Sequence, residues 1–72
     1  MSHIVDARGL SCPQPVLMTL DEIQKQGRGA IEVLVDTDTS RENVSRAARS
    51  RGWRIREISE EGEGYRIAME KD

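Results

Sequence analysis

The sequence predicts an α+β two-layer sandwich, in which two helices pack on one face of a mixed four-stranded sheet. Apolar residues recur in the order strand, helix, strand, helix, strand, strand (βαβαββ). Right-handed crossovers place both helices on the same face when each returning strand is added in one direction. The 72 residues are 36% hydrophobic, with one Trp, one Tyr and no Phe. We therefore expect a single domain over residues 1–72, with a thin aliphatic core and its function at the surface.

The first half of the chain predicts a strand, a helix and a second strand. The first strand is expected over residues 4–6 and the first helix over residues 14–26, ended by the Gly-Arg-Gly segment 27–29. The apolar face of this helix is expected to contain Val16, Leu17, Leu20 and Ile23. Residues 30–36 form the clearest strand, and it is expected to be central in the sheet. Its buried face is expected to contain Ile31, Val33 and Val35.

A second helix is predicted after this strand. Thr39, followed three residues later by Glu42, fits a capping box, so the helix is expected to start there and to run to about Arg51. Asp36 and Asp38, just before it, are expected to bond amides of the loop and the helix start. We do not expect them to ligate a metal, because a hard cation needs more oxygen donors than these carboxylates supply.

The last part of the chain predicts two strands joined by a hairpin. The third strand is expected to start at Trp53, whose side chain belongs to the core, and a bulge or the strand end is expected at Ile58, which breaks the alternation. Residues 59–64 are acidic and contain two glycines, so they are expected to form the hairpin loop. Residues 65–70 then form the fourth strand.

The segment Asp6–Pro15 contains the only cysteine and leads directly into the first helix. Proline is well accommodated in a first helical turn, so Cys12 is expected at the N-cap, Pro13 at N1 and Pro15 at N3. The main free donors of the turn would then be the amides of Cys12 and Gln14. A sulfur at this position lies at the positive end of the helix dipole, which favours the thiolate and lowers its pKa moderately below about 8.5.

The residues around Cys12 are expected to shape and present it. Gly9 is expected to adopt a φ that only glycine tolerates cheaply, and Asp6 to bond loop amides. Arg8, Gln14 and Met18 are the candidate contacts for a partner or an anion, although Met18 fits the core equally well. Functional groups gather at the carboxyl ends of parallel strands, so the two helix starts are expected side by side.

This segment resembles the signature of the TusA-like, or SirA-like, sulfur-carrier family: Asp-x-Arg-Gly is followed by Cys-Pro-x-Pro near the N-terminus of a chain of single-domain length. The resemblance covers essentially the whole chain and implies a βαβαββ sandwich. It also implies that Cys12 accepts sulfane sulfur as a persulfide from a cysteine desulfurase or another donor protein, and passes it to an acceptor protein. The second helix looks more like the YedF-like branch associated with selenium metabolism. In that branch the unit is often part of a longer protein, whereas this sequence has one unit, which leaves the pathway open.

The residues also agree with carrier chemistry without the family resemblance. A carrier needs an exposed thiolate and no general base of its own. No histidine or second cysteine stands beside Cys12, and His3 is interpreted as a solvated residue. A lone cysteine excludes an internal disulfide, a CxxC pair and a cysteine-based zinc cluster, so we expect no metal and no cofactor. A free thiol stays reduced in the cytoplasm, which is the expected location.

The net charge of −2 predicts no strong attraction to nucleic acid or to an anionic membrane, and the lack of a basic and apolar N-terminal segment predicts no signal peptide or membrane span. We expect a monomer. Six arginines support an alternative, an RNA- or protein-binding regulatory module that uses the second helix and third strand: Arg41, Arg46, Arg49, Arg51, Arg54 and Arg56. We favour solvated faces on which arginines pair with Glu32, Glu57 and Glu70. Direct nucleic-acid binding is not expected, because Trp53 is assigned to the core and cannot stack on bases. A second alternative is an interaction domain with an idle thiol.

Overall fold

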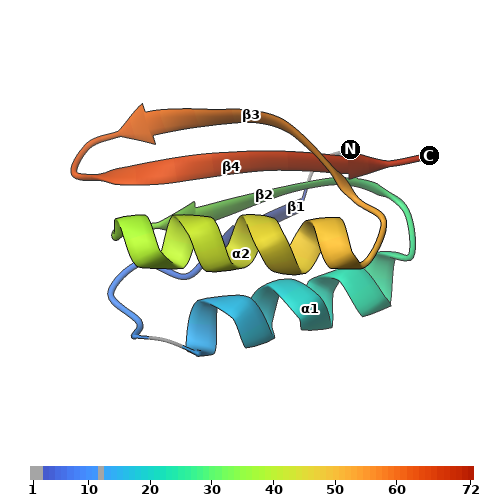
Figure 1. Cartoon of the computed structure of the whole chain (residues 1–72), viewed down its shortest axis with the longest axis horizontal. Coiled ribbons are helices and arrows are strands. Elements are labelled where there is room, and N and C mark those ends of the chain that lie inside the picture. The colour runs from blue at the N-terminus through green and yellow to red at the C-terminus, as the bar shows by residue number, and fades with distance from the viewer. Residues whose placement is uncertain (1–2, 12) are drawn as a thin grey trace.

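The computed structural model describes residues 3–11 and 13–72, and these form the two predicted layers (Figure 1). The elements occur in the predicted order βαβαββ. Their bounds are β1 His3–Asp6, α1 Gln14–Gln26, β2 Gly29–Val35, α2 Asp38–Ser50, β3 Arg54–Glu61 and β4 Gly64–Lys71.

The sheet has the strand order β1-β2-β4-β3. β1 runs parallel to β2, whereas β4 is antiparallel to both of its neighbours, β2 and β3. Both helices lie on one face of the sheet, and the opposite face has no covering layer among the described residues (Figure 1). β1 and β3 are therefore the two edge strands.

The core lies between the sheet and the helices. The fully buried side chains of β2 are the three that alternation predicts, Ile31, Val33 and Val35. Trp53 is also buried, at 2% exposure, although it stands just before β3 and not in it. The other buried apolar residues come from both layers and are Val5, Ala7, Ile23, Val44, Ala48, Ile67 and Met69.

The face of α1 that meets the sheet differs from the prediction. Leu17, expected in the core, is 53% exposed, and Leu20 is half-buried. The buried residues are Pro15, Thr19 and Ile23, which follow one another at four-residue spacing. Thr19 can occupy the centre of this face because its hydroxyl donates to the Pro15 carbonyl at 2.8 Å, so the buried hydroxyl has a partner.

The start of α2 also corrects the prediction. The N-cap is Thr37, whose backbone is extended and whose hydroxyl accepts a hydrogen bond from the Ser40 amide at 3.1 Å. Thr39 already lies inside the helix, so the expected capping box of Thr39 with Glu42 is wrong. The chain turns into the helix two residues earlier because β2 ends at Val35 and leaves Thr37 as the residue at the turn.

The hairpin between β3 and β4 is tighter than predicted. Both strands extend into the expected loop, so that only Gly62 and Glu63 remain in the turn, with Gly62 at a φ of +63°. Of the bulge or strand end expected at Ile58, the structure has a bulge, and β3 continues past Ile58. The bulge lies earlier than expected, at a register shift between Ile55 and Glu57. Because one extra residue stands there, Ile55 and Ile58 are both half-buried on the helix side of β3.

Candidate functional site

Two loops meet at one end of the sheet, and together they form the candidate site. The loop of residues 7–13 follows β1, and residues 36–37 follow β2. They lie together because β1 and β2 are parallel neighbours, and both loops appear at the same end of the molecule in Figure 1. The Ala7 amide continues the pairing beyond β1 by donating to the Leu34 carbonyl at 2.9 Å.

A hydrogen bond joins the two loops directly. The Gly9 amide donates to Oδ2 of Asp36 at 2.7 Å. Gly9 has a φ of +79°, the conformation expected for this turn, which a residue with a Cβ would adopt only with strain. Asp36 therefore bonds a loop amide, as its position before α2 indicated, and it fixes the N-terminal side of the segment that carries Cys12.

Asp6 and Arg8 form a two-pronged ion pair at the end of β1. Arg8 Nε donates to Asp6 Oδ1 at 2.9 Å, and Nη2 donates to Oδ2 at 2.8 Å. The Arg8 amide also donates to Oδ1, at 3.2 Å, so Asp6 bonds the loop. The side-chain hydrogen bond, followed by that of the amide, lowers the pKa of Asp6 to about 2. The charge of Arg8 is thus matched locally by Asp6, and its expected contact with a partner or an anion stays a prediction.

The first turn of α1 starts one residue later than predicted. Pro13, not Cys12, is the N-cap, and Pro15 is therefore at N2 and not N3. The Gln14 amide, expected to be a free donor, donates to the Ser11 carbonyl at 3.0 Å. The expected exposure and ionisation of Cys12 itself lie outside the described residues.

A hollow of about 400 Å³ separates the Cys12 loop from the start of α2. Its lining comes from both loops and from the first turn of α2: Gly9, Leu10, Ser11, Asp36, Thr37, Thr39 and Ser40. Leu10 is 38% exposed beside it, and Leu17 is exposed on α1. Sequence reasoning missed both leucines as surface groups, since Leu17 falls within an apolar helical stripe. The signal available for Leu10 was an apolar residue in a short turn.

Comparison with known proteins agrees with this geometry. A family model described as sulfurtransferase TusA matches residues 3–71. The chain belongs to the TusA family. Among solved structures, the crystal structure of a SirA-like protein from Desulfitobacterium hafniense has 29% sequence identity and a TM-score of 0.86, and the match covers 97% of this chain and 96% of that chain. No curated protein matches the chain. The predicted TusA-like family and the βαβαββ fold are thereby confirmed.

The remaining candidates of this TusA-family chain fall into different surroundings. Met18 is half-buried and packs against the core, and Gln14 is exposed at the start of α1. His3 begins β1, at the strand end away from the two loops, where its Nδ1 lies 3.7 Å from a carboxylate oxygen of Glu22. No group of three or more metal-ligating side chains occurs within residues 3–11 and 13–72. In the same residues no helix has the length and apolarity to cross a membrane.

Arginines on the sheet and on α2 have different surroundings, and those on the open sheet face are paired. Arg54 and Arg56 of β3 both reach Glu70, at 2.8 Å and 3.3 Å. Arg66 of β4 lies 3.1 Å from Glu32 and 2.9 Å from a second carboxylate, that of Glu61. Of the pairs expected for the six arginines, those with Glu70 are present. Glu32 instead pairs with Arg66, and Glu57 forms no ion pair within the described residues. The arginines of β3 are thus neutralised by their neighbours.

Proposed function

We propose that this TusA-family chain is a sulfur carrier, in which Cys12 receives sulfane sulfur as a persulfide and passes it to a partner protein. The observation that supports the proposal most is the exposure of the residues on both sides of Cys12. Ser11 and Pro13 are both exposed, and so is Leu10. They stand where the carboxyl ends of β1 and β2 meet, a position that a second protein can approach.

The proposed exchange needs no redox partner. In the loading step the Cys12 thiolate attacks the outer sulfur of a donor persulfide, so that a new S–S bond forms while the S–S bond of the donor breaks. The donor departs as a thiolate, and Cys12 holds the persulfide. In the delivery step an acceptor thiolate attacks the outer sulfur in the same way, and Cys12 is released as a thiolate. One sulfur atom passes from the donor protein to the acceptor protein, and no external oxidant or reductant is needed.

The described residues position the segment and leave the chemistry to the sulfur. Asp36 holds the Gly9 amide, and the ion pair of Asp6 with Arg8 braces the end of β1. Pro13 and Pro15 stiffen the start of α1, since each fixes its own φ. A rigid surround fits a carrier, because the same sulfur must meet two different proteins in one geometry.

Two exposed leucines give the partner an apolar contact. Leu10 precedes Cys12 and Leu17 follows it, and both leave a third or more of their side chains in solvent. We propose a cysteine desulfurase or another donor protein on one side of the exchange, and an acceptor protein with a thiol on the other. Both would work in the cytoplasm, where thiols stay reduced. The exchange is the same whether the pathway serves sulfur or selenium metabolism.

The test is to incubate the protein with a cysteine desulfurase and cysteine, and then to weigh it intact. We expect the wild type to gain one sulfur atom and to lose it again on treatment with a reducing thiol. Cys12→Ser should gain none, while the neighbouring Ser11→Ala should load like the wild type. A wild-type protein whose mass stays unchanged would contradict the proposal, as would a Cys12→Ser protein that gains sulfur.

A further inference from the structure

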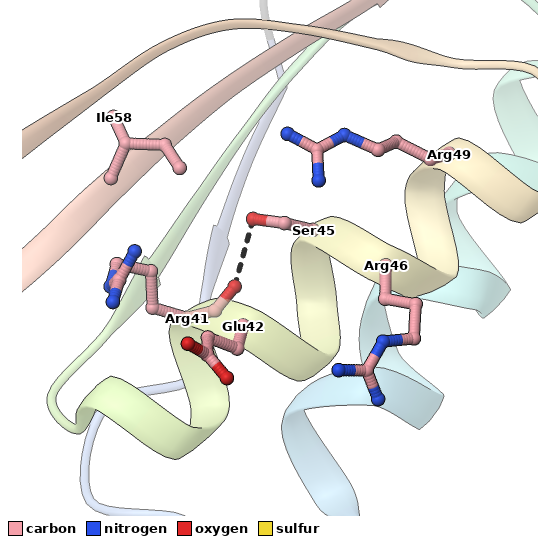
Figure 2. A pocket seen from close by; sticks show the side chains of 6 residues that line it. All are labelled: Arg41, Glu42, Ser45, Arg46, Arg49 and Ile58. Carbon is pink, nitrogen blue, oxygen red and sulfur yellow. Dashed lines mark hydrogen bonds between the residues drawn. The ribbon is translucent and has the colours of Figure 1, made fainter.

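A second hollow lies away from the Cys12 loop, between α2 and the edge strand β3. Its volume is about 340 Å³, and five of its six lining residues belong to α2. The lining consists of Arg41, Glu42, Ser45, Arg46, Arg49 and Ile58 (Figure 2). It exists because β3 is the outermost strand while the helices cover the rest of the sheet, so that the helix side of β3 is only partly covered.

The hollow is basic, and its charges are only partly neutralised. Arg46 and Arg49 form no ion pair with any residue in ranges 3–11 and 13–72. In Figure 2, Arg41 and Arg49 extend toward the side where Ile58 lies, whereas Glu42 and Arg46 point away from Ile58. The single carboxylate of the lining therefore leaves the positive charge beside β3 in place.

Arg41 is held in position at one end of the hollow. Its guanidinium lies 5.2 Å from the centre of the Tyr65 ring, and its Nε lies 3.7 Å from Asp38. Tyr65 is held in turn, because its hydroxyl donates to Asp38. Arg41 Nε is nevertheless buried without a hydrogen-bond acceptor among the described residues. The Arg41 side chain as a whole is still 30% exposed, so a fixed and partly exposed cation stands at this end of the hollow.

The single lining residue from β3, Ile58, is apolar. Ile58 is half-buried and packs against the core from β3, so its outer surface meets the hollow. No aromatic ring lines the hollow, and the two aromatic residues of the chain are occupied: Trp53 is buried and Tyr65 packs under Arg41. Nucleic-acid bases would have no stacking surface here, whereas a peptide with acidic and apolar side chains would match the arginines and Ile58.

We propose that the hollow between α2 and β3 docks an acidic segment of the protein that exchanges sulfur with this chain. The inference rests on the proposed carrier function for the identity of the partner. The two hollows share α2: Thr39 and Ser40 line the one beside the Cys12 loop, and Arg41 and Glu42 line this one. A protein anchored on the arginines would thus stand beside the Cys12 loop, and the anchoring contact would lie outside the reacting site.

The test measures the binding of a fluorescein-labelled peptide of alternating glutamate and leucine by fluorescence anisotropy. Arg49→Glu reverses one charge of the hollow. Arg28→Glu is the matched control, because it makes the same charge change in the exposed turn after α1. We expect Arg49→Glu to weaken binding about tenfold, as the loss of one charge-assisted contact implies. Arg28→Glu should leave the affinity within about twofold, since it makes no direct contact.

Three outcomes would overturn the inference. The peptide could fail to bind the wild type, or the two variants could weaken peptide binding equally. In the third outcome, a labelled single-stranded RNA binds the wild type more tightly than the peptide does and loses that affinity in Arg49→Glu. Sulfur loading is measured separately, with inorganic polysulfide as donor and Cys12→Ser as control. Polysulfide needs no docking, so Arg49→Glu should load like the wild type. Loading without peptide binding would refute the docking site alone. Peptide binding without loading would refute the carrier function, and with it the identity of the partner, while the hollow would stand as a site for acidic peptides.

Discussion

Gly64, the first residue of β4, is the position at which one added methyl group should do the most damage. A Cβ there would lie 2.2 Å from the Val35 carbonyl oxygen and 3.0 Å from the Asp36 Cα. Both are main-chain atoms at the end of β2, so no side-chain rotation can relieve the overlap. Gly64→Ala must therefore displace the end of β2 from β4, and with it the carboxylate of Asp36 that holds the Gly9 amide.

The expected loss of unfolding free energy is about 2–4 kcal/mol, because overpacking against an unyielding neighbour costs about 1–3 kcal/mol and occasionally more. A domain of this length has roughly 4–11 kcal/mol in total, so the loss is a large share. Gly62→Ala is the matched control. Gly62 has a φ of +63° but no atom within 4 Å of an added Cβ, so only the backbone penalty of about 1–2 kcal/mol applies.

The measurement is equilibrium unfolding in urea, followed by the fluorescence of Trp53, which is buried in the folded protein and becomes exposed on unfolding. Gly64→Ala should lower the transition midpoint clearly more than Gly62→Ala, with a similar slope for both. Gly64→Ala should also load sulfur more slowly in the mass assay under conditions in which it remains folded. A Gly64→Ala protein at least as stable as Gly62→Ala would refute the reasoning.

Three further predictions concern the loops and the helix start. Asp36→Ala removes the acceptor of a loop amide, so it should slow sulfur loading and lower the unfolding free energy by about 0.5–1.5 kcal/mol; Asp36→Asn keeps an acceptor oxygen, and equal effects of the two variants would contradict this account. The pKa of Asp6 is lowered from 3.8 to about 2, so its stabilising contribution is complete above pH 3.8 and is lost as the pH falls through about 2. The urea midpoint of the wild type should therefore fall more than that of Asp6→Asn between these pH values, by a small amount because the ion pair is exposed, and parallel curves would count against it. Thr37→Ala should cost about 1 kcal/mol as the loss of an N-cap, and Thr39→Ala should cost less than about half of that; the reverse order would favour a cap at Thr39.

The order of the elements was predictable because apolar alternation in this chain is strong where the sheet is most buried. Ile31, Val33 and Val35 show a period of two without interruption, which identifies a strand and its inner face. The break in alternation at Ile58 indicated a bulge or the strand end, and the structure has the bulge just before it, between Ile55 and Glu57, which keeps the two isoleucines on one side.

The wrong predictions concern a polar residue that occupies a core position, and two residues that are equally suitable as an N-cap. Hydropathy counts Thr19 as polar, yet its hydroxyl is satisfied within the helix, so it takes the central buried position and turns Leu17 to the surface. Thr37 and Thr39 are both good N-caps by residue type. Only the end of β2 decides between them, and that end is set by pairing with β1 and β4.

The candidate site was predictable in outline and not in its contacts. Two parallel strands imply that their following loops meet, which places Asp36 near the Cys12 loop. The bond from Asp36 to the Gly9 amide depends on the strand register, and the pairing of Asp6 with Arg8 depends on a turn whose shape local sequence does not determine. The hollow beside α2 depends on how far β3 extends beyond the helices. The hydrophobic periodicity of the sequence does not predict that distance.

The ion pairs of the open sheet face have a consequence for how the strands find their alignment. Arg54 joins β3 to Glu70 on β4, and Arg66 joins β4 to Glu32 on β2. Because side chains alternate between the faces, a one-residue slip of β4 would carry its charged residues beneath the helices, where no opposite charge awaits them. The charged face thus disfavours misaligned strand pairing, even though each exposed ion pair adds little to the free energy of unfolding. A chain in which Arg66 and Glu32 exchanged places would keep the same strand register. The effect depends on which face of the sheet carries the charged side chains and not on the sign of each charge.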